Sequence, residues 1–529
     1  MKILVSDKLS PKGVAVFENA DGISVDVKTG LSPDELKAII GEYDGLVIRS
    51  ATKVTSEIIE SADNLKVVGR AGSGLDNVDI PAASKKGIVV MNTPGGNTIT
   101  TAEHALSMML ALSRKIPQAT FSMKSGKWDK KKFMGAEICN KTLGIVGIGL
   151  VGSVVADRAN GLKMNVIAFD PYLSPERAEK LGVQLVSMDE LLQRADYITI
   201  HVPKTNDTLN LIDKECFSKM KEGVLLINCA RGGIVNEKDL YDAIQSKKVA
   251  GAALDVFDKE PPDTDNPLLG CEEVICTPHL GASTEEAQEN VAVAVAEQMV
   301  DYLLNGTIRN AANVPSVDSD VLATLKPYLN LAERMGNFQG QVVDGGLKEV
   351  SIEYSGEIAN VKTAPITVSL LKGLLFPILQ EDVNYVNAPI IAKERGIKVI
   401  ESITNESEDF ISLINLRVKT SKGEYSVAGT IFGKSDPWIV QVDQFKIEAT
   451  PDKFMLLFHT QDRPGVIGNI GTSLAKHGIN ISRMQFGREN VEGKSLLLLS
   501  TDDLVSAEVI KEMKELPHVI SMNSIEIIC

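Results

Sequence analysis

The sequence predicts an α/β protein with two Rossmann-like domains on parallel sheets, then an α+β intervening domain and a C-terminal ferredoxin-like domain. The 529 residues exceed what one hydrophobic core normally holds. Residues 1–95 and 142–279 each alternate apolar runs with helical segments, which is typical of parallel sheets. Residues 452–529 read strand, helix, strand, strand, helix, strand, the split βαβ order.

The first alternation contains five short apolar runs with many β-branched residues, at 2–7, 23–28, 45–50, 65–72 and 88–93. The segments 32–42 and 55–63 between them have helical spacing and begin with an N-capping Ser or Thr. We expect residues 1–96 to form one domain with residues 287–311, because a long helix carries the chain back to it. That helix is predicted from Thr284 to Asn305, with Ser283 and Glu286 as a capping box and Gly306 at its end.

The second domain is expected to span residues 97–286. It begins with a helix over Thr98–Leu112, followed by a polar surface stretch at 125–135. Strands are predicted within 142–146, 166–170, 197–203, 223–230, 249–257 and 272–279. The regular alternation of strands and helices ends after residue 311. Residues 312–451 mix helices and strands without a chemical motif, and residues 452–529 form the last domain.

The bulk properties exclude some partners. A net charge of −15 argues against nucleic acid or an anionic membrane as the main partner, since both require basic surface. The six cysteines form neither a C-x-x-C pair nor a zinc-spaced cluster, so we expect reduced thiols and no metal site. The N-terminus lacks the apolar core of a signal peptide and no apolar run is long enough to span a membrane, which favours the cytoplasm.

A glycine-rich turn marks a candidate phosphate site. The pattern Gly147-Ile-Gly149-Leu-Val-Gly152 follows a strand, opens a helix and precedes Asp170 by 18 residues. Alone, this pattern is equally compatible with a packing turn, but its strand–turn–helix context predicts a dinucleotide site. An acid at Asp170 binds ribose hydroxyls and would repel a 2′-phosphate, which favours NAD over NADP.

Three charged residues follow consecutive strands. Arg231, Glu260 and His279 each come after a predicted strand, and ligands of open parallel sheets bind beyond the carboxyl ends of the strands. Each residue alone could be structural: a loop cap, a solvated acid or a buried imidazole. Together they suit oxidation of a 2-hydroxy acid, with His279 as base, Glu260 as its partner and Arg231 on the substrate carboxylate.

The stretches around these residues, "GIVGIGLVG", "NCARGGIVNE", "LDVFDKEPP" and "TPHLGASTEEAQ", resemble the D-isomer-specific 2-hydroxyacid dehydrogenase family. The whole chain is similar to the long members of that family, which carry an allosteric substrate-binding-type domain and an ACT regulatory domain. Those members oxidise 3-phospho-D-glycerate to 3-phosphohydroxypyruvate with NAD, the first step of L-serine biosynthesis.

The resemblance assigns roles to individual positions. It implies Arg231, Glu260 and His279 as catalytic residues. Implied cofactor contacts are Gly147, Gly149, Leu150, Val151, Gly152, Asp170, Pro203, Thr208, Cys229, Ala230, Asp255, His279 and Gly281. Implied substrate contacts are Arg49, Arg70, Ser73 and Asn97. Lys130, Lys131 and Lys132 are implied to add positive charge for the phosphate, with contribution across a dimer interface as one option. The lysine run also fits a plain solvated surface.

The segment "FHTQDRPGVIGNIGTSLAKHGINIS" resembles the ACT signature. It implies L-serine as effector, with Asp462 on the ammonium, Asn480 on the carboxylate and Thr460 nearby; His459 should face the opposite side of the strand. A pure assembly role for this domain stays open. So do two other functions for the chain: a related dehydrogenase acting on glycerate or hydroxypyruvate, and an NAD-sensing binding protein without turnover. We expect a homodimer or homotetramer.

Overall fold

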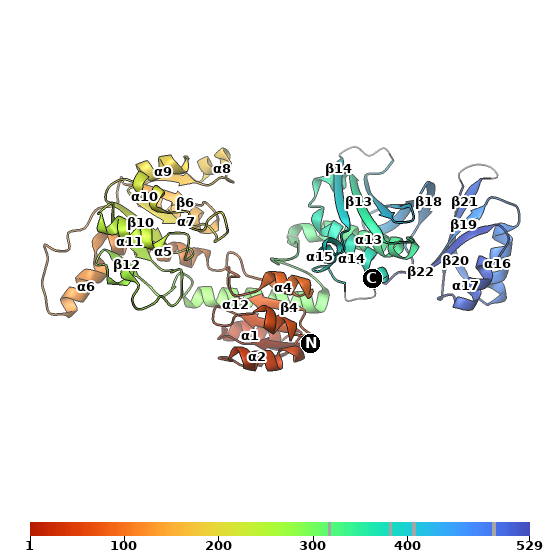
Figure 1. Ribbon diagram of the computed structural model, residues 1–529, viewed down its shortest axis with the longest axis horizontal. Helices are drawn as coiled ribbons and strands as arrows, with labels where there is room; N and C mark the ends of the chain where they lie inside the picture. The colour runs from red at the N-terminus through yellow and green to blue at the C-terminus, as the bar shows by residue number, and fades with distance from the viewer. Residues whose placement is uncertain (316–318, 380–382, 405–408, 489–492, 529) are drawn as a thin grey trace.

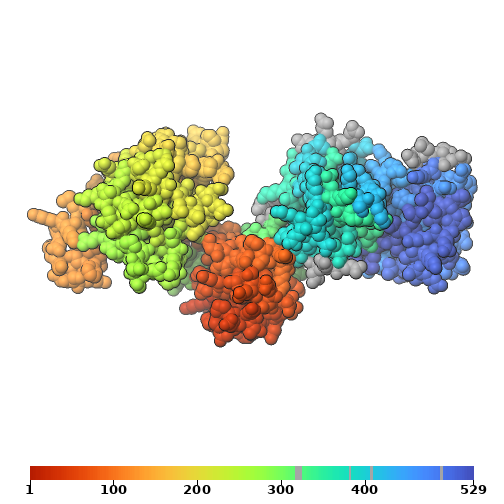
Figure 2. Space-filling model, in the orientation of Figure 1, coloured from red at the N-terminus to blue at the C-terminus, as the bar shows by residue number. Residues whose placement is uncertain are grey.

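The computed structural model describes residues 1–315, 319–379, 383–404, 409–488 and 493–528. It contains four sheets, and we call the parts built on them the first, second, third and fourth units in chain order. The first unit lies between the second unit on one side and the third and fourth units on the other (Figures 1 and 2).

The first unit is a parallel sheet in the order β2-β1-β3-β4-β5, so the strand order reverses between β1 and β3. Its strands are β1 (Lys2–Val5), β2 (Ser24–Val27), β3 (Gly45–Ile48), β4 (Val67–Arg70) and β5 (Val89–Met91). Its helices are α1 (Pro11–Glu18), α2 (Pro33–Ile39), η1 (Ile40–Glu42), α3 (Ser56–Glu60) and α4 (Ile80–Lys85). The five predicted strands are confirmed, and Ser32 caps α2 in a capping box with Glu35.

Helix α12 (Glu285–Asn305) returns the chain to this unit, as predicted, and packs along α1 and β4. Val291, Val295 and Met299 of α12 are buried in one cluster with Ile3 and Phe17. The predicted N-cap was wrong by one residue. Thr284, not Ser283, accepts the N–H of Ala287 at 3.2 Å, because the N–H of Ser283 is still bonded to the Leu280 carbonyl in the preceding turn.

The second unit is a seven-stranded parallel sheet in the order β12-β11-β10-β9-β6-β7-β8, the doubly wound order with its reversal between β6 and β9. Its strands are β6 (Thr142–Val146), β7 (Asn165–Phe169), β8 (Gln184–Leu185), β9 (Tyr197–Ile200), β10 (Val224–Asn228), β11 (Val249–Leu254) and β12 (Val274–Cys276). Its helices are α5 (Thr98–Arg114), α6 (Ile116–Lys124), α7 (Leu150–Gly161), α8 (Pro175–Lys180), α9 (Met188–Arg194), α10 (Lys214–Lys219), α11 (Glu237–Gln245) and η2 (Pro267–Gly270).

The third unit is a mixed sheet in the order β14-β13-β15-β16-β17-β18, backed by two long helices. The strands are β13 (Leu347–Gly356), β14 (Lys398–Thr404), β15 (Ser412–Thr420), β16 (Glu424–Phe432), β17 (Asp436–Val442) and β18 (Phe445–Ala449). The helices are α13 (Ser319–Val342), η3 (Glu357–Asn360), α14 (Ala364–Leu379) and α15 (Ala388–Glu394). Helices α13 and α14 touch at Gly336, where a Cβ would lie 2.2 Å from the Leu370 carbonyl oxygen.

The fourth unit has the predicted βαββαβ order and an antiparallel sheet, β20-β21-β19-β22. Its elements are β19 (Phe454–Gln461), α16 (Val466–Lys476), β20 (Ile481–Arg488), β21 (Lys494–Thr501), α17 (Ala507–Lys514) and β22 (Val519–Glu526). One sheet face packs on α16 and α17, while Met455, Leu457, Leu496, Leu498, Ile525 and Ile527 of the other face belong to the core of the third unit.

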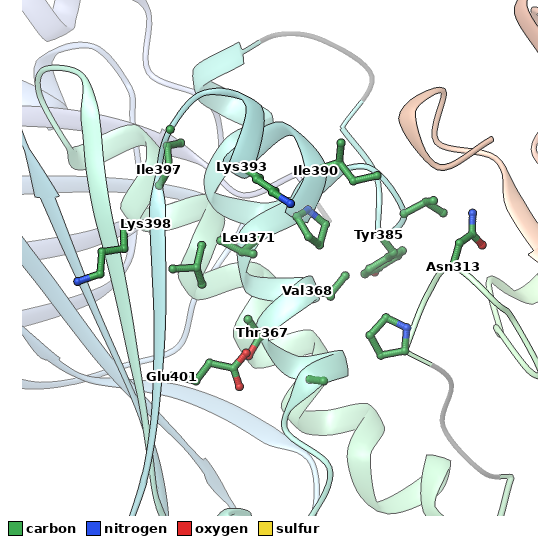
Figure 3. Close-up of a pocket in the computed structure, with 16 residues that line it drawn as sticks. Asn313, Thr367, Val368, Leu371, Tyr385, Ile390, Lys393, Ile397, Lys398 and Glu401 are labelled. Carbon is green, nitrogen blue, oxygen red and sulfur yellow. The ribbon is translucent and has the colours of Figure 1, made fainter. Parts of the chain in front are cut away.

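The first and third units share a smaller contact, in which Val386 is buried in the first-unit cluster and Asn384 donates to the Gly87 carbonyl at 2.9 Å. A cavity of about 700 Å³ opens between α14, α15, β14 and the segment around Asn313 (Figure 3). Its wall is mostly apolar, and the charged residues that line it are Lys393, Lys398 and Glu401. The exact domain limits stay predictions. Within the described ranges, no helix combines the length and the apolar character needed to cross a membrane.

Candidate active site

The carboxyl edges of the first two sheets face each other. Arg231 follows β10 of the second unit, and its Nε donates to Asp76 Oδ2 of the first unit at 3.2 Å. Asp76 lies in the loop after β4, at the carboxyl end of that strand. Since parallel strands gather the residues that follow them at one edge, this contact brings the loops of both sheets around a common cleft.

The glycine-rich turn lies at the reversal point of the second sheet, between β6 and α7. Gly147 has a φ of +93°, which favours glycine. A Cβ on Gly152 would lie 2.1 Å from the Gly147 carbonyl oxygen, whereas a Cβ on Gly149 would meet nothing within 4 Å. The first N–H groups of α7 carry no side-chain cap, so the helix start is open to an anion, with Leu150 exposed and Val151 half-buried beside it.

Asp170 follows β7 and closes this turn from the side. Its Oδ2 accepts the N–H of Ile148 at 2.8 Å, and its Oδ1 accepts the N–H of Tyr172 at 2.9 Å. Each carboxylate oxygen keeps a further lone pair for a ribose hydroxyl. The turn, the open helix end and this acid therefore fit a dinucleotide.

His279 and Glu260 form a hydrogen-bonded pair. The Nδ1 of His279 lies 2.7 Å from Glu260 Oε2, and both side chains are about half-buried. The hydrogen bond that His279 donates to Glu260 is the main reason that the pKa of His279 lies above its ordinary value. Because Nδ1 is engaged, Nε2 is the ring atom left to exchange a proton with a ligand.

Asp255 lies under the loop that carries His279. Its carboxylate accepts the N–H of Leu280 at 2.7 Å and that of Gly281 at 2.8 Å. Burial alone would raise the pKa of Asp255, but its hydrogen bonds, led by the one from His104, hold it below the ordinary value. Cys229 is buried nearby, and burial with the Asp255 charge raises the pKa of its thiol. Both side chains are directed into the protein, which favours a supporting role.

Three arginines lie at the cleft. Arg49 follows β3, Arg70 ends β4 and Arg231 reaches in from the second unit. Burial, and next the charge of Arg231, lowers the pKa of Arg70 to about 10, and its Nε is buried without a partner among the described residues. Gly72 and Gly74 leave room for the guanidinium groups, since a Cβ there would lie 2.3 Å from Arg70 Nη1 and 2.2 Å from Arg231 Nη2. The cluster suits a polyanionic small molecule.

The remaining expected contacts are two hydrogen-bonded pairs and Ala230. The hydroxyl of Ser73 donates to Asn97 Oδ1 at 2.6 Å, so these residues are together beside the arginines. Thr208 donates to the Pro203 carbonyl at 2.6 Å in the loop after β9. The carbonyl of Ala230 accepts from Arg231 Nη1 at 2.7 Å and fixes that guanidinium.

The lysine run lies elsewhere. Lys130, Lys131 and Lys132 are exposed in the segment after α6, and Lys132 lies 3.4 Å from Glu272. Glu272 precedes β12, whereas His279 follows it, so the lysines are at the opposite edge of the sheet from the cleft of their own chain.

The three expected effector residues do not share an environment. Thr460 is fully buried, and its hydroxyl lies 2.7 Å from that of Ser495. Asp462 lies 3.5 Å from Arg488 Nη1, and exposed Asn480 donates to Asp502 at 2.8 Å. His459 faces the other side of the strand, as predicted, with its ring against Phe445 of the third unit.

Sequence reasoning missed two residues of the site. His104 has its Nε2 3.2 Å from Asp255 Oδ1, and Asp76 pairs with Arg231. His104 lies one turn before Met108 on the apolar face of α5, so a polar residue on that stripe was the available signal. Asp76 lies in an ordinary polar loop. Its partner Arg231 belongs to another domain, so nothing in the sequence near Asp76 predicts the ion pair.

Comparison with known proteins agrees with this geometry. Residues 106–281 match the NAD binding domain of D-isomer specific 2-hydroxyacid dehydrogenases, residues 324–443 the D-3-phosphoglycerate dehydrogenase intervening domain, and residues 454–518 the ACT domain. The D-3-phosphoglycerate dehydrogenase of Archaeoglobus fulgidus is 46% identical over 100% of both chains. That of Methanocaldococcus jannaschii is 46% identical over 98% of both chains.

Among solved structures, the NAD-dependent formate dehydrogenase of Staphylococcus aureus in complex with NAD is 30% identical, with a TM-score of 0.53. The match covers 98% of that chain and 59% of this one. The latter is about the share of this chain that residues 1–311 represent. The fold and the site thus define an NAD-dependent oxidoreductase of the 2-hydroxyacid dehydrogenase class, with an ACT domain. Within this class, the chain belongs to the D-3-phosphoglycerate dehydrogenase family.

Proposed function

We propose that this chain oxidises 3-phospho-D-glycerate to 3-phosphohydroxypyruvate with NAD, the first step of L-serine biosynthesis. The observation that carries the proposal is the His279–Glu260 pair, 2.7 Å apart, at the same cleft as the Arg49, Arg70 and Arg231 cluster. A proton acceptor and three cations match an alcohol that also bears a carboxylate and a phosphate.

His279 acts as the general base in this proposal. Its Nε2 takes the proton of the C2 hydroxyl as the C2 hydride leaves, so that the C–O bond becomes a carbonyl. Glu260, bonded to Nδ1, fixes the ring and stabilises the imidazolium that forms. The bound cofactor supplies a nicotinamide ring that accepts the hydride.

The arginines orient the substrate. Arg231 binds the carboxylate and polarises the developing carbonyl, while Arg49 and Arg70 hold the other anionic group, with Ser73 and Asn97 as hydrogen-bonding neighbours. The cofactor would be held by the Gly147–Gly152 turn, Asp170 and the loops at Pro203–Thr208 and Cys229–Ala230, with Asp255 and Gly281 shaping the nicotinamide side.

The test is NAD reduction with 3-phosphoglycerate, D-glycerate and D-lactate, for the wild type and His279→Ala. We expect 3-phosphoglycerate to be strongly preferred, and the loss of the base to lower kcat by about 100-fold or more. Preference for an unphosphorylated acid would favour the related dehydrogenase, and absence of turnover with every acid would favour the NAD-sensing protein.

We further propose that L-serine inhibits the enzyme through the fourth unit. Asp462 and Asn480 carry this proposal, because both lie at loops beside the sheet and can pair with an ammonium and a carboxylate. Buried Thr460 would need a rearrangement to take part. Millimolar serine should inhibit the wild type and not an Asp462→Ala, Asn480→Ala double variant; a wild type whose activity and thermal stability ignore serine refutes this.

A homodimer or homotetramer is the third proposal. Phe121, Trp128 and Met134 are each at least 75% exposed on α6 and the segment after it, an apolar surface that a second copy would cover. Such a contact could also carry Lys130 and Lys132 to the partner's cleft. Light scattering on the purified chain measures the assembly, and a monomer with full activity contradicts it.

A further inference from the structure

The catalytic histidine lies in a backbone conformation that needs support. His279 has a φ of +54°, which is uncommon for a residue with a side chain. Its N–H is bonded to the Asp255 carbonyl at 2.9 Å and to the Thr277 carbonyl at 3.0 Å. The next two N–H groups, of Leu280 and Gly281, are held by the Asp255 carboxylate. One residue therefore fixes three successive peptide groups.

Asp255 in turn depends on two groups that bond the same oxygen. The hydroxyl of Thr277 donates to Asp255 Oδ1 at 2.6 Å, and His104 Nε2 lies 3.2 Å from that oxygen and 3.2 Å from the hydroxyl. The hydroxyl proton is committed to the carboxylate, and a carboxylate only accepts. His104 Nε2 must therefore carry a hydrogen and donate it.

His104 is well placed to anchor the loop of His279, because α5 contacts that loop and the residue before α12 at three points. Besides His104, Thr101 donates to the Gly281 carbonyl at 3.0 Å, and Thr100 lies 3.3 Å from Thr284. The His104 side chain is 18% exposed and that of Asp255 is 0% exposed, so a lost partner would be replaced poorly by water.

We propose that His104 is a positioning residue: through Asp255 it holds the loop of His279 in the geometry that proton transfer requires. The role rests on the proposed function of His279 as base. The contacts of the His104 ring are to Asp255 and Thr277, and neither is a residue that we assign to the substrate, so His104 acts through Asp255 and not on the substrate.

Four titratable groups face Asp255: His104 from α5, Cys229 after β10, Glu260 after β11 and His279 after β12. Glu260 and ionised Asp255 both favour the protonated form of His279. If His104 is removed, burial makes Asp255 take up a proton at higher pH and its hold on the loop weakens. The acid-side loss of activity should then begin at higher pH.

The test compares His104→Leu, His104→Gln and Met109→Leu in the full chain. Leucine removes the donor, glutamine keeps a side-chain N–H, and Met109 is a buried residue of the same helix that serves as the packing control. Amide hydrogen exchange of the peptide containing Leu280 and Gly281 reads the loop directly, and kcat and KM are measured across pH.

We expect exchange at this peptide to accelerate in His104→Leu, kcat to fall about tenfold and KM for NAD to change by less than about twofold. In His104→Gln, both the exchange rate at this peptide and kcat should stay close to the wild-type values. Unchanged exchange in His104→Leu, or an equal rise in Met109→Leu, overturns the proposal. A wild type without turnover refutes the proposed function instead, and the exchange measurement remains valid because it needs no reaction.

Discussion

At the scale of single residues, the proposed reaction depends on a half-buried imidazole whose proton affinity is raised mainly by one neighbour. The pKa of His279 is raised mainly by the hydrogen bond with Glu260. The protonated ring cannot accept a substrate proton, so in the proposed reaction the raised pKa moves the acid limb of NAD reduction to higher pH than an ordinary histidine would give.

Glu260→Gln should therefore shift the acid limb of kcat/KM to lower pH and lower kcat at least about tenfold, because glutamine no longer stabilises the imidazolium. The measurement is the pH dependence of NAD reduction. Asp263→Asn is the control, since Asp263 is a carboxylate of the same loop that pairs with Lys259. A limb that stays in place would show that another group titrates there.

Much of the site was predictable from sequence because its residues follow strands of parallel sheets, and topology brings such positions to one edge. Arg231, Glu260, His279 and Asp170 were found in this way. His104 and Asp76 were not, because their roles come from contacts between elements: α5 against Asp255, and a first-unit loop against Arg231. The burial of Thr460 was equally invisible, because its register partner Ser495 is 35 residues away.

At the scale of elements, Gly147 and Gly152 let α7 begin close to β6, the first through its positive φ and the second through its close approach to the Gly147 carbonyl. Periodicity predicted the elements, but not that Gly152 and Gly149 differ: the first packs against a carbonyl and the second faces open space. The first and last residues of helices were less predictable, because hydrogen bonds in the preceding turn decide where a helix begins. The N-cap of α12, which is one residue later than predicted, is an example.

Gly152→Ala should weaken NADH binding at least about tenfold. Its Cβ would lie 2.1 Å from the Gly147 carbonyl oxygen, so α7 would have to move away from the turn to which we assign the cofactor pyrophosphate. Fluorescence titration with NADH measures this without turnover. Gly161→Ala at the other end of α7 is the matched control, since a Cβ there meets nothing within 4 Å. Equal affinities in the two variants would contradict the packing argument.

At the scale of the whole molecule, the junctions between the units differ. The third and fourth units share one core: Met455, Leu457, Leu496 and Leu498 are buried among third-unit side chains. Gln341 of α13 also exchanges hydrogen bonds with the backbone of Glu526 in β22, at 2.9 and 3.0 Å. The first and third units share a looser junction, in which Val386 is buried in the first-unit cluster, Asn384 donates to the Gly87 carbonyl at 2.9 Å, and the Lys85–Glu394 contact is exposed.

This asymmetry predicts how the chain tolerates truncation. A chain of residues 1–315 should remain folded, reduce NAD with 3-phosphoglycerate and ignore serine, because the cut crosses the loose junction. A chain of residues 1–451 should unfold at a temperature several degrees lower than the full chain and aggregate, since it exposes the apolar third-unit core that the fourth unit covers. Calorimetry and activity assays on the three chains measure this. If residues 1–451 melt like the full chain, the shared core does not stabilise the third unit.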